Sequence, residues 1–178
     1  RLQNSKVKFY IGDVRDRSSV DDAMTGVDYV FHAAALKQVP TCEFFPMQAM
    51  QTNVIGSKNV IESAISCGVS KVVSLSTDKA VYPVNALGIT KALMEKIIQS
   101  TSRKLSEGQT VLTLVRYGNV LFSRGSVIPL FMKLIRENKP LTVTEPRMTR
   151  FLLPLKEAIN LVGFALENGV QGDIFVRN

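Results

Sequence analysis

The side chains best suited to acid–base chemistry stand together in the segment Thr77-Asp78-Lys79. The apolar run 72–75 precedes this segment and is typical of a buried strand, so the acid and the base are expected at a strand end. Asp78 and Lys79 would both be ionised in water, so catalytic roles require their burial and coupled proton transfer. The competing interpretation is an ordinary solvated pair at the end of a strand.

A second lysine follows on a segment with helical spacing. Lys91 comes twelve residues after Lys79 and four residues after Leu87, so Leu87 and Lys91 are expected on one helix face. Leucine cannot act as a base. Tyr82 lies nine residues before Lys91, so helical phase does not bring it to the position of Leu87. The sequence therefore predicts a site with a lysine on the helix and no phenolic base one turn before it.

The composition is that of a globular domain. The chain has 178 residues, of which 46% are hydrophobic and 21% charged, which allows one domain with a real core and excludes a disordered chain. Cys42 and Cys67 are too few for a disulfide framework, so we expect reduced thiols and a cytoplasmic location. No apolar run approaches the length of a membrane span. We expect His32, the single histidine, in the core, and no metal site.

The positive charge of the chain invites the hypothesis of a nucleic-acid partner. The net charge is +7, but the basic residues are scattered and aromatic residues do not alternate with them. A phosphate-rich small molecule fits this balance as well as a nucleic acid does. We therefore expect no nucleic acid and an anionic small-molecule ligand.

Strand-like and helical patterns alternate along the chain. Strand-like patterns cover residues 8–11, 28–32, 71–75, 110–117, 141–144, 151–153 and 173–176. Helical patterns cover residues 18–25, 46–66, 86–105, 127–137 and 156–167. The alternation predicts an α/β fold with a Rossmann-like, doubly wound parallel sheet. Because the glycine fingerprint Gly-x-Gly-x-x-Gly is missing, we expect the sheet to lack its first βαβ unit.

Six segments carry a family resemblance through their order and spacing: residues 12–16, 32–40, 76–82, 116–120, 123–129 and 148–151. They resemble the extended short-chain dehydrogenase/reductase family, and within it the bacterial UDP-N-acetylglucosamine 4,6-dehydratases of polysaccharide synthesis. The wider family carries Tyr-x-x-x-Lys on a helix, and Leu87 stands at the tyrosine position. A residue other than tyrosine there resembles the capsule and O-antigen branch, whose enzymes invert C5.

The resemblance implies a nicotinamide cofactor, with NADP favoured over NAD. The residues implied to bind it are Asp13, Val14, Ala33, Ala34, Ala35 and Lys91. Asp13 would accept from the adenine amine, and the three alanines would let the backbone approach the phosphates and ribose. An aspartate after a strand is, as the alternative, often only a turn or helix-capping residue.

The resemblance also implies a substrate of the UDP-N-acetylglucosamine type. The residues implied to bind it are Lys37, Asn119, Ser126, Val127 and Arg150. Backbone N–H groups at the helix start by Ser126 suit a pyrophosphate, and the guanidinium of Arg150 suits a diphosphate, although a surface charge is the alternative. We divide the chain into a partial NAD(P)-binding domain, residues 1–125, and an interleaved partial sugar-nucleotide-binding region, residues 126–178.

The catalytic residues implied by the resemblance are Thr77, Asp78, Lys79 and Lys91. Lys79 would take the C5 proton, Asp78 would protonate the departing C6 hydroxyl, and Thr77 would hydrogen-bond O4. Lys91 would bind the nicotinamide ribose. The O4 proton would leave through Thr77, Lys91 or Asp78.

Two alternative functions and one question of assembly stay open. A UDP-sugar C4 epimerase needs no C5 base but normally needs the tyrosine, and a non-catalytic dinucleotide-binding scaffold needs neither. We expect a homo-oligomer. Met47, Met50 and Val54 share a helical stripe that would suit an oligomer interface or, more simply, the core.

Overall fold

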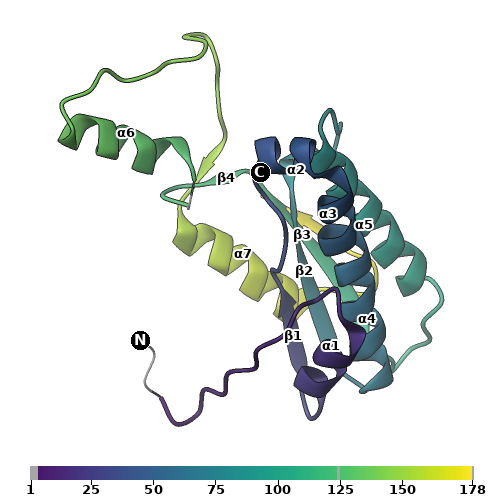
Figure 1. Ribbon diagram of the computed structural model, residues 1–178. Coiled ribbons are helices and arrows are strands. Elements are labelled where there is room, and N and C mark those ends of the chain that lie inside the picture. The colour runs from purple at the N-terminus through teal and green to yellow at the C-terminus, as the bar shows by residue number, and fades with distance from the viewer. Residues whose placement is uncertain (1–3, 124, 178) are drawn as a thin grey trace.

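The computed structural model describes residues 4–123 and 125–177 and shows a parallel sheet between two layers of helices (Figure 1). The four strands are β1 (Tyr29–His32), β2 (Lys71–Thr77), β3 (Val111–Tyr117) and β6 (Ile174–Val176), in the order β1-β2-β3-β6. One face is covered by α1 (Arg17–Met24), α4 (Gly56–Ser66) and α5 (Ala86–Ser102), and the other by α7 (Leu155–Asn168). The predicted Rossmann-like parallel fold is confirmed. Arg124, in one of the six segments, lies outside the described residues.

Both faces of the central strands are buried, because helices cover the sheet on two sides. Even-numbered residues such as Val72 and Leu114 pack with α1, α4 and α5. Odd-numbered residues such as Val73 and Val115 pack with Ala165 of α7. A strand buried on both faces reads as a continuous apolar run, which is the pattern the sequence shows before Thr77.

The predicted helix at 46–66 is divided by a π-helical turn. It consists of α3 (Pro46–Met50), η1 (Gln51–Ile55) and α4, and a short helix, α2 (Val39–Phe44), precedes it. Asn53 in η1 is fully buried. Its side chain accepts from the Leu36 N–H at 2.8 Å, and donates to the Leu36 carbonyl and to Thr90 Oγ1 at 3.0 Å each. This turn therefore fixes the loop that follows β1, as π-helical turns often do at functional sites.

Two predicted strands are wrong. Residues 8–11 and 141–144 have no strand geometry, and they are exposed. An apolar run forms a strand only when a neighbouring strand supplies hydrogen-bond partners, and neither segment pairs with a strand of the described chain. The strand predicted at 151–153 is present as β5 (Leu152–Leu153), which pairs with β4 (Asn119–Val120).

Residues 127–151 form an arm that stands away from the sheet (Figure 1). The arm consists of α6 (Val127–Arg136) and a long loop, and none of the residues of α6 is buried. Since α6 does not pack into the core, its position relative to the sheet is set by the loops at its two ends.

The stripe of Met47, Met50 and Val54 does not form one continuous surface. Val54 is 3% exposed and belongs to the core, whereas Met47 is 61% exposed. The homo-oligomer stays a prediction. Among the helices of residues 4–123 and 125–177, none combines the length and apolar character needed to cross a membrane.

Replacing Ser74 tests the cost of a buried hydroxyl in the sheet. Ser74 is fully buried, and its Oγ has no hydrogen-bond partner among the described residues. An unsatisfied buried hydroxyl costs about 1–3 kcal/mol, so Ser74→Ala should raise the free energy of unfolding by about 1 kcal/mol in denaturant titrations. The matched control is Ser57→Ala, because the hydroxyl of Ser57, 1% exposed, is paired with His32. Ser57→Ala should lower the free energy of unfolding, and equal effects of the two substitutions would contradict the explanation.

Candidate active site

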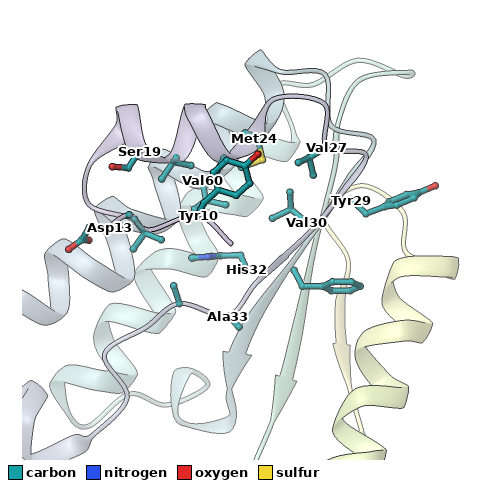
Figure 2. Close-up of a pocket in the computed structure, with 16 residues that line it drawn as sticks. Tyr10, Asp13, Ser19, Met24, Val27, Tyr29, Val30, His32, Ala33 and Val60 are labelled. Atoms are coloured by element: carbon teal, nitrogen blue, oxygen red, sulfur yellow. The ribbon is translucent and has the colours of Figure 1, made fainter. Parts of the chain in front are cut away.

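Two adjoining cavities open at the carboxyl ends of β1, β2 and β3. The first, about 510 Å³, is lined by many of the predicted catalytic and ligand-binding residues, namely Ala33, Ala35, Lys37, Thr77, Lys79, Lys91, Asn119 and Ser126. The second, about 410 Å³, is lined by Asp13, Val14, Ala33 and Ala34 among others. Figure 2 shows this second cavity with Asp13 at one end and Tyr29 at the other. Because Ala33 belongs to both walls, the two cavities meet just after β1.

The predicted acid and base lie in a short 3₁₀ turn, η2 (Asp78–Ala80), directly after β2. One carboxylate oxygen of Asp78 accepts from Thr77 Oγ1 at 2.8 Å and from Lys79 Nζ at 3.0 Å. Lys79 Nζ also donates to Asn119 Oδ1 at 3.3 Å. The structure therefore brings four of the predicted residues into one hydrogen-bonded chain.

Lys91 and Leu87 share the buried face of α5, as the helical spacing predicted. Each is 6% exposed, and both line the 510 Å³ cavity. Lys91 Nζ donates to the Leu75 carbonyl of β2 at 2.9 Å. Burial lowers the pKa of Lys91 to about 8, and the Glu95 carboxylate opposes this shift. Lys91 therefore keeps its proton in most molecules at neutral pH.

Gly88 lets α5 approach the turn that carries Lys79. A Cβ at this position would overlap the Lys79 carbonyl oxygen and lie 3.2 Å from Pro83 Cβ. The helix begins just before Gly88, where the Asn85 side chain accepts from the Gly88 N–H at 2.9 Å. A side chain here would push the helix and η2 apart, so this glycine helps to position the predicted base.

Asp13 lies at the rim of the 410 Å³ cavity and is held by Arg15. The Arg15 guanidinium donates to both carboxylate oxygens, and the Arg15 backbone N–H donates to Oδ1. These hydrogen bonds lower the pKa of Asp13 to about 2, so it is ionised at neutral pH. An adenine amine would have to share oxygens that the turn already uses. The adenine contact of Asp13 and Val14 stays a prediction.

His32 is the buried histidine that the sequence predicted. Its Nε2 lies 2.8 Å from Ser57 Oγ, and the ring is 4% exposed. Burial, with a smaller contribution from the positive charge of Lys91, lowers the pKa of His32 to about 4. A neutral ring at physiological pH fits a structural role at the wall of the 410 Å³ cavity (Figure 2).

The arm separates two of the predicted substrate-binding residues from the cavities. Val127 and Arg150 are exposed and line neither cavity, and the Arg150 guanidinium contacts its own loop, through the Thr149 carbonyl and Met148 Sδ. Ser126, at the base of the arm, does line the 510 Å³ cavity, and its buried Oγ has no partner among the described residues. An unpaired hydroxyl in a cavity wall suits a polar ligand, so the structure favours Ser126 over Val127 and Arg150.

Three positioning residues were absent from the sequence-based predictions: Asn53, Gly88 and Glu95. Asn53 fixes the loop after β1, and Gly88 permits close packing against η2. Glu95 is 3% exposed and lies one helical turn after Lys91. The spacing of four residues between Lys91 and Glu95 was the one signal in the sequence that could have identified a member of this group.

Comparisons with known proteins support the resemblance at the level of the family. The family described as polysaccharide biosynthesis protein matches residues 1–178. The chain is 63% identical over 176 residues to a Rickettsia prowazekii protein named UDP-glucose 4-epimerase, covering 99% of this chain and 52% of that protein. The chain thus spans about half the length of the curated relatives it matches. Their name is that of the alternative function rather than that of the predicted dehydratase.

Solved structures share the fold closely. Pen from Bacillus thuringiensis has a TM-score of 0.95 at 42% identity, covering 98% of this chain and 55% of that chain. DesIV from Streptomyces venezuelae, a dTDP-glucose 4,6-dehydratase with NAD and TYD bound, has a TM-score of 0.89 at 21% identity, covering 98% and 59% of the two chains. At that identity the second likeness shows the fold alone.

The packing role of Gly88 can be tested against a matched glycine. Gly88→Ala should lower the free energy of unfolding, because the new Cβ meets the Lys79 carbonyl. Gly163→Ala is the control, since Gly163 is also inside a helix but a Cβ there would have no heavy atom within 4 Å. That control should raise the free energy of unfolding by about 0.5–1 kcal/mol through helix propensity. Thermal and denaturant unfolding measure both, and stabilisation by Gly88→Ala would contradict the packing argument.

Proposed function

The chain belongs to the polysaccharide biosynthesis protein family, and from that membership we propose that the whole protein is a nicotinamide-dependent UDP-N-acetylglucosamine 4,6-dehydratase that inverts C5. The observation that carries the proposal is the Asp78–Lys79 hydrogen bond, in which Lys79 lines the 510 Å³ cavity together with the apolar Leu87, while Asp78 lines a further cavity of about 620 Å³. The end of β2 thus offers a base in the cavity wall with an acid hydrogen-bonded to it, and α5 offers no phenol at the position that would normally carry the base.

The two adjoining cavities fit an extended dinucleotide. Small side chains at Ala33, Ala34 and Ala35 line the passage between them, so a ligand could lie close to the backbone after β1. Lys91 has three N–H donors. One goes to the Leu75 carbonyl and a second points at Met94 Sδ at 3.6 Å, which leaves one for a ribose hydroxyl. When bound, a nicotinamide would supply the redox chemistry by accepting the C4 hydride and returning it to C6. The family resemblance favours NADP, and NAD is the form present in the DesIV structure.

The Asp78–Lys79 pair can supply both proton transfers of the elimination. Movement of one proton from Lys79 to Asp78 along their 3.0 Å hydrogen bond produces a neutral amine and a carboxylic acid. The amine then takes the C5 proton while Asp78 protonates the departing C6 hydroxyl, so water leaves and the ion pair is restored. A proton added to the opposite face of C5 completes the inversion, and it balances the proton that O4 loses on oxidation of C4.

Water must be excluded before this pair can act. The side chains of Lys79 and Asp78 are 34% and 39% exposed, and an ion pair in contact with water favours the charged forms. A sugar held between Lys37, Asn119 and Ser126 would cover the cavity wall beside the pair. We therefore infer that the bound substrate covers the Asp78–Lys79 pair and excludes water from it. Proton transfer within the pair then becomes less costly.

A second candidate function is a UDP-sugar C4 epimerase. The curated relatives at 62–64% identity carry the name UDP-glucose 4-epimerase, and this supports the alternative. An epimerase has no use for a C5 base and depends on a base near O4. Both reactions remove the O4 proton, so Leu87 does not separate them, and Lys79, which only the dehydratase uses as a C5 base, favours the dehydratase.

The product of the whole protein distinguishes the candidates. With UDP-N-acetylglucosamine and NADP or NAD, we expect a 4-keto-6-deoxy sugar nucleotide that has lost one water, detected by mass spectrometry and NMR. Formation of the C4 epimer with unchanged mass would establish the alternative. Dinucleotide binding without turnover of either UDP-glucose or UDP-N-acetylglucosamine would instead indicate a non-catalytic scaffold.

Substitutions in η2 test the two proton-transfer roles separately. Lys79→Ala should reduce solvent-deuterium incorporation at C5 by about 100-fold or more, because the base is removed. Asp78→Asn should retain part of this C5 exchange but lose elimination of the C6 hydroxyl. Lys104→Ala, which removes an exposed lysine away from both cavities, is the control and should leave both rates unchanged. Full dehydration by Lys79→Ala would overturn the assignment of the base.

A further inference from the structure

Glu95 is a buried carboxylate behind the catalytic turn that the proposed mechanism does not use. It is 3% exposed and lines none of the three cavities found among the described residues. Oε1 accepts from Ser76 Oγ at 2.5 Å and from Arg116 Nε at 2.9 Å, and Oε2 accepts from Arg116 Nη2 at 2.5 Å. Both oxygens are therefore occupied, in the two-pronged geometry that makes arginine–carboxylate pairs strong.

The partners of Glu95 stand at one level of the sheet. Ser76 of β2 and Arg116 of β3 are register partners, and the next pair along these strands is Thr77 and Tyr117. Glu95 thus connects α5 to β2 and β3 at the level where Ser76 and, one residue further along β3, Tyr117 line the 510 Å³ cavity. A displacement of this carboxylate would move the starting point of η2, and with it the Asp78–Lys79 pair.

Glu95 also acts on Lys91, which lies one helical turn earlier. The Glu95 carboxylate raises the pKa of Lys91, against the larger lowering by burial. The other titratable groups around Lys91 are His32 of β1, Lys79 after β2 and Tyr117 of β3. His32 is neutral at physiological pH, and Lys79 carries the same charge as Lys91. Within this group, Glu95 is the side chain that favours the charged lysine.

We propose that Glu95 is a positioning residue for the proposed reaction: it holds the ends of β2 and β3 against α5 and keeps the Lys91 ammonium charged. This inference rests on the proposed function for its reaction but not for its geometry. Arg116 balances the charge of Glu95 and, being 23% exposed in its side chain, faces a third cavity of about 620 Å³ beside Asp78. The Ser76–Glu95–Arg116 network therefore reaches from the 510 Å³ cavity, which Ser76 lines, to this third cavity, which Arg116 and Asp78 line.

The test compares Glu95→Gln with Ser76→Ala in the whole protein. Glu95→Gln removes the negative charge, so Lys91 should lose its proton at lower pH, and the basic limb of the kcat–pH profile should move down by about one pH unit. The value of kcat should fall about tenfold while KM for the sugar nucleotide stays within about twofold, since Glu95 does not line the cavity. Ser76→Ala removes one hydrogen bond but keeps the charge, so it should lower kcat without moving the basic limb.

A second variant guards against misfolding. Glu95→Gln leaves the Arg116 guanidinium without its carboxylate, and the variant could fail to fold for that reason. The double variant Glu95→Gln with Arg116→Met removes both charges at similar volume, and should show the same shift of the basic limb. An unshifted limb in the double variant, or a rise in KM at unchanged kcat, would overturn the positioning role.

The outcome can be separated from the fate of the proposed function. The pH profile is measured on whichever product the wild-type protein forms, so a C4 epimer would overturn the dehydratase and leave the test of Glu95 intact. The dissociation constant of NAD, titrated against pH in the same proteins, gives a readout that needs no turnover. NAD binding should weaken once Lys91 loses its proton. In Glu95→Gln this weakening should begin about one pH unit lower than in the wild type. Identical pH dependence in the two proteins would overturn the inference.

Discussion

Close contact between α5 and the carboxyl end of β2 is the constraint on which the candidate site depends. Three features produce it at three successive levels of the helix. Gly88 leaves room for the Lys79 carbonyl, Lys91 donates to the Leu75 carbonyl, and Glu95 accepts from Ser76. Because the helix is rigid, these contacts fix the strand end and the lysine of the helix in one frame. These contacts therefore also fix the position of the turn η2, which carries Asp78 and Lys79.

The same contact places ionised groups in a region from which water is largely excluded. Lys91 and Glu95 are 6% and 3% exposed, and burial of isolated charges at such positions would cost several kcal/mol per ion. The cost is offset because each charge is hydrogen-bonded, Lys91 to a backbone carbonyl and Glu95 to Arg116 and Ser76. The arrangement supplies a lysine that is charged at neutral pH yet closer to its pKa than an exposed lysine would be. Such a group can both hold a ribose and influence nearby proton transfers.

The sequence predicted the parts that depend on local pattern, and failed where the outcome depends on distant partners. The strand end at Thr77 and the helix face shared by Leu87 and Lys91 follow from periodicity, and both are present. The strand at 8–11 is absent because strand formation needs a neighbour that no local pattern can reveal. Asn53 escaped notice for the same reason: its role arises from a π-helical turn and from the loop it binds. The clamp assigned to Arg150 lies on a loop outside the core, whose position no local pattern reveals, and it stays a prediction.

Leu87 explains why proton transfer would move from the helix to the strand end. It packs beside Cys42 and Ala49 in an apolar cluster, while its other side faces the 510 Å³ cavity. A hydroxyl brought to this wall would need a hydrogen-bond partner, and the neighbours in the cluster are apolar. In the hydrogen-bonded chain from Thr77 through Asp78 to Lys79, the two end residues line the same cavity, and the chain already contains a donor and an acceptor within 3.0 Å. The apolar Leu87 therefore stabilises the packing of α5, and the acid–base pair after β2 would supply the proton transfers in place of a tyrosine at position 87.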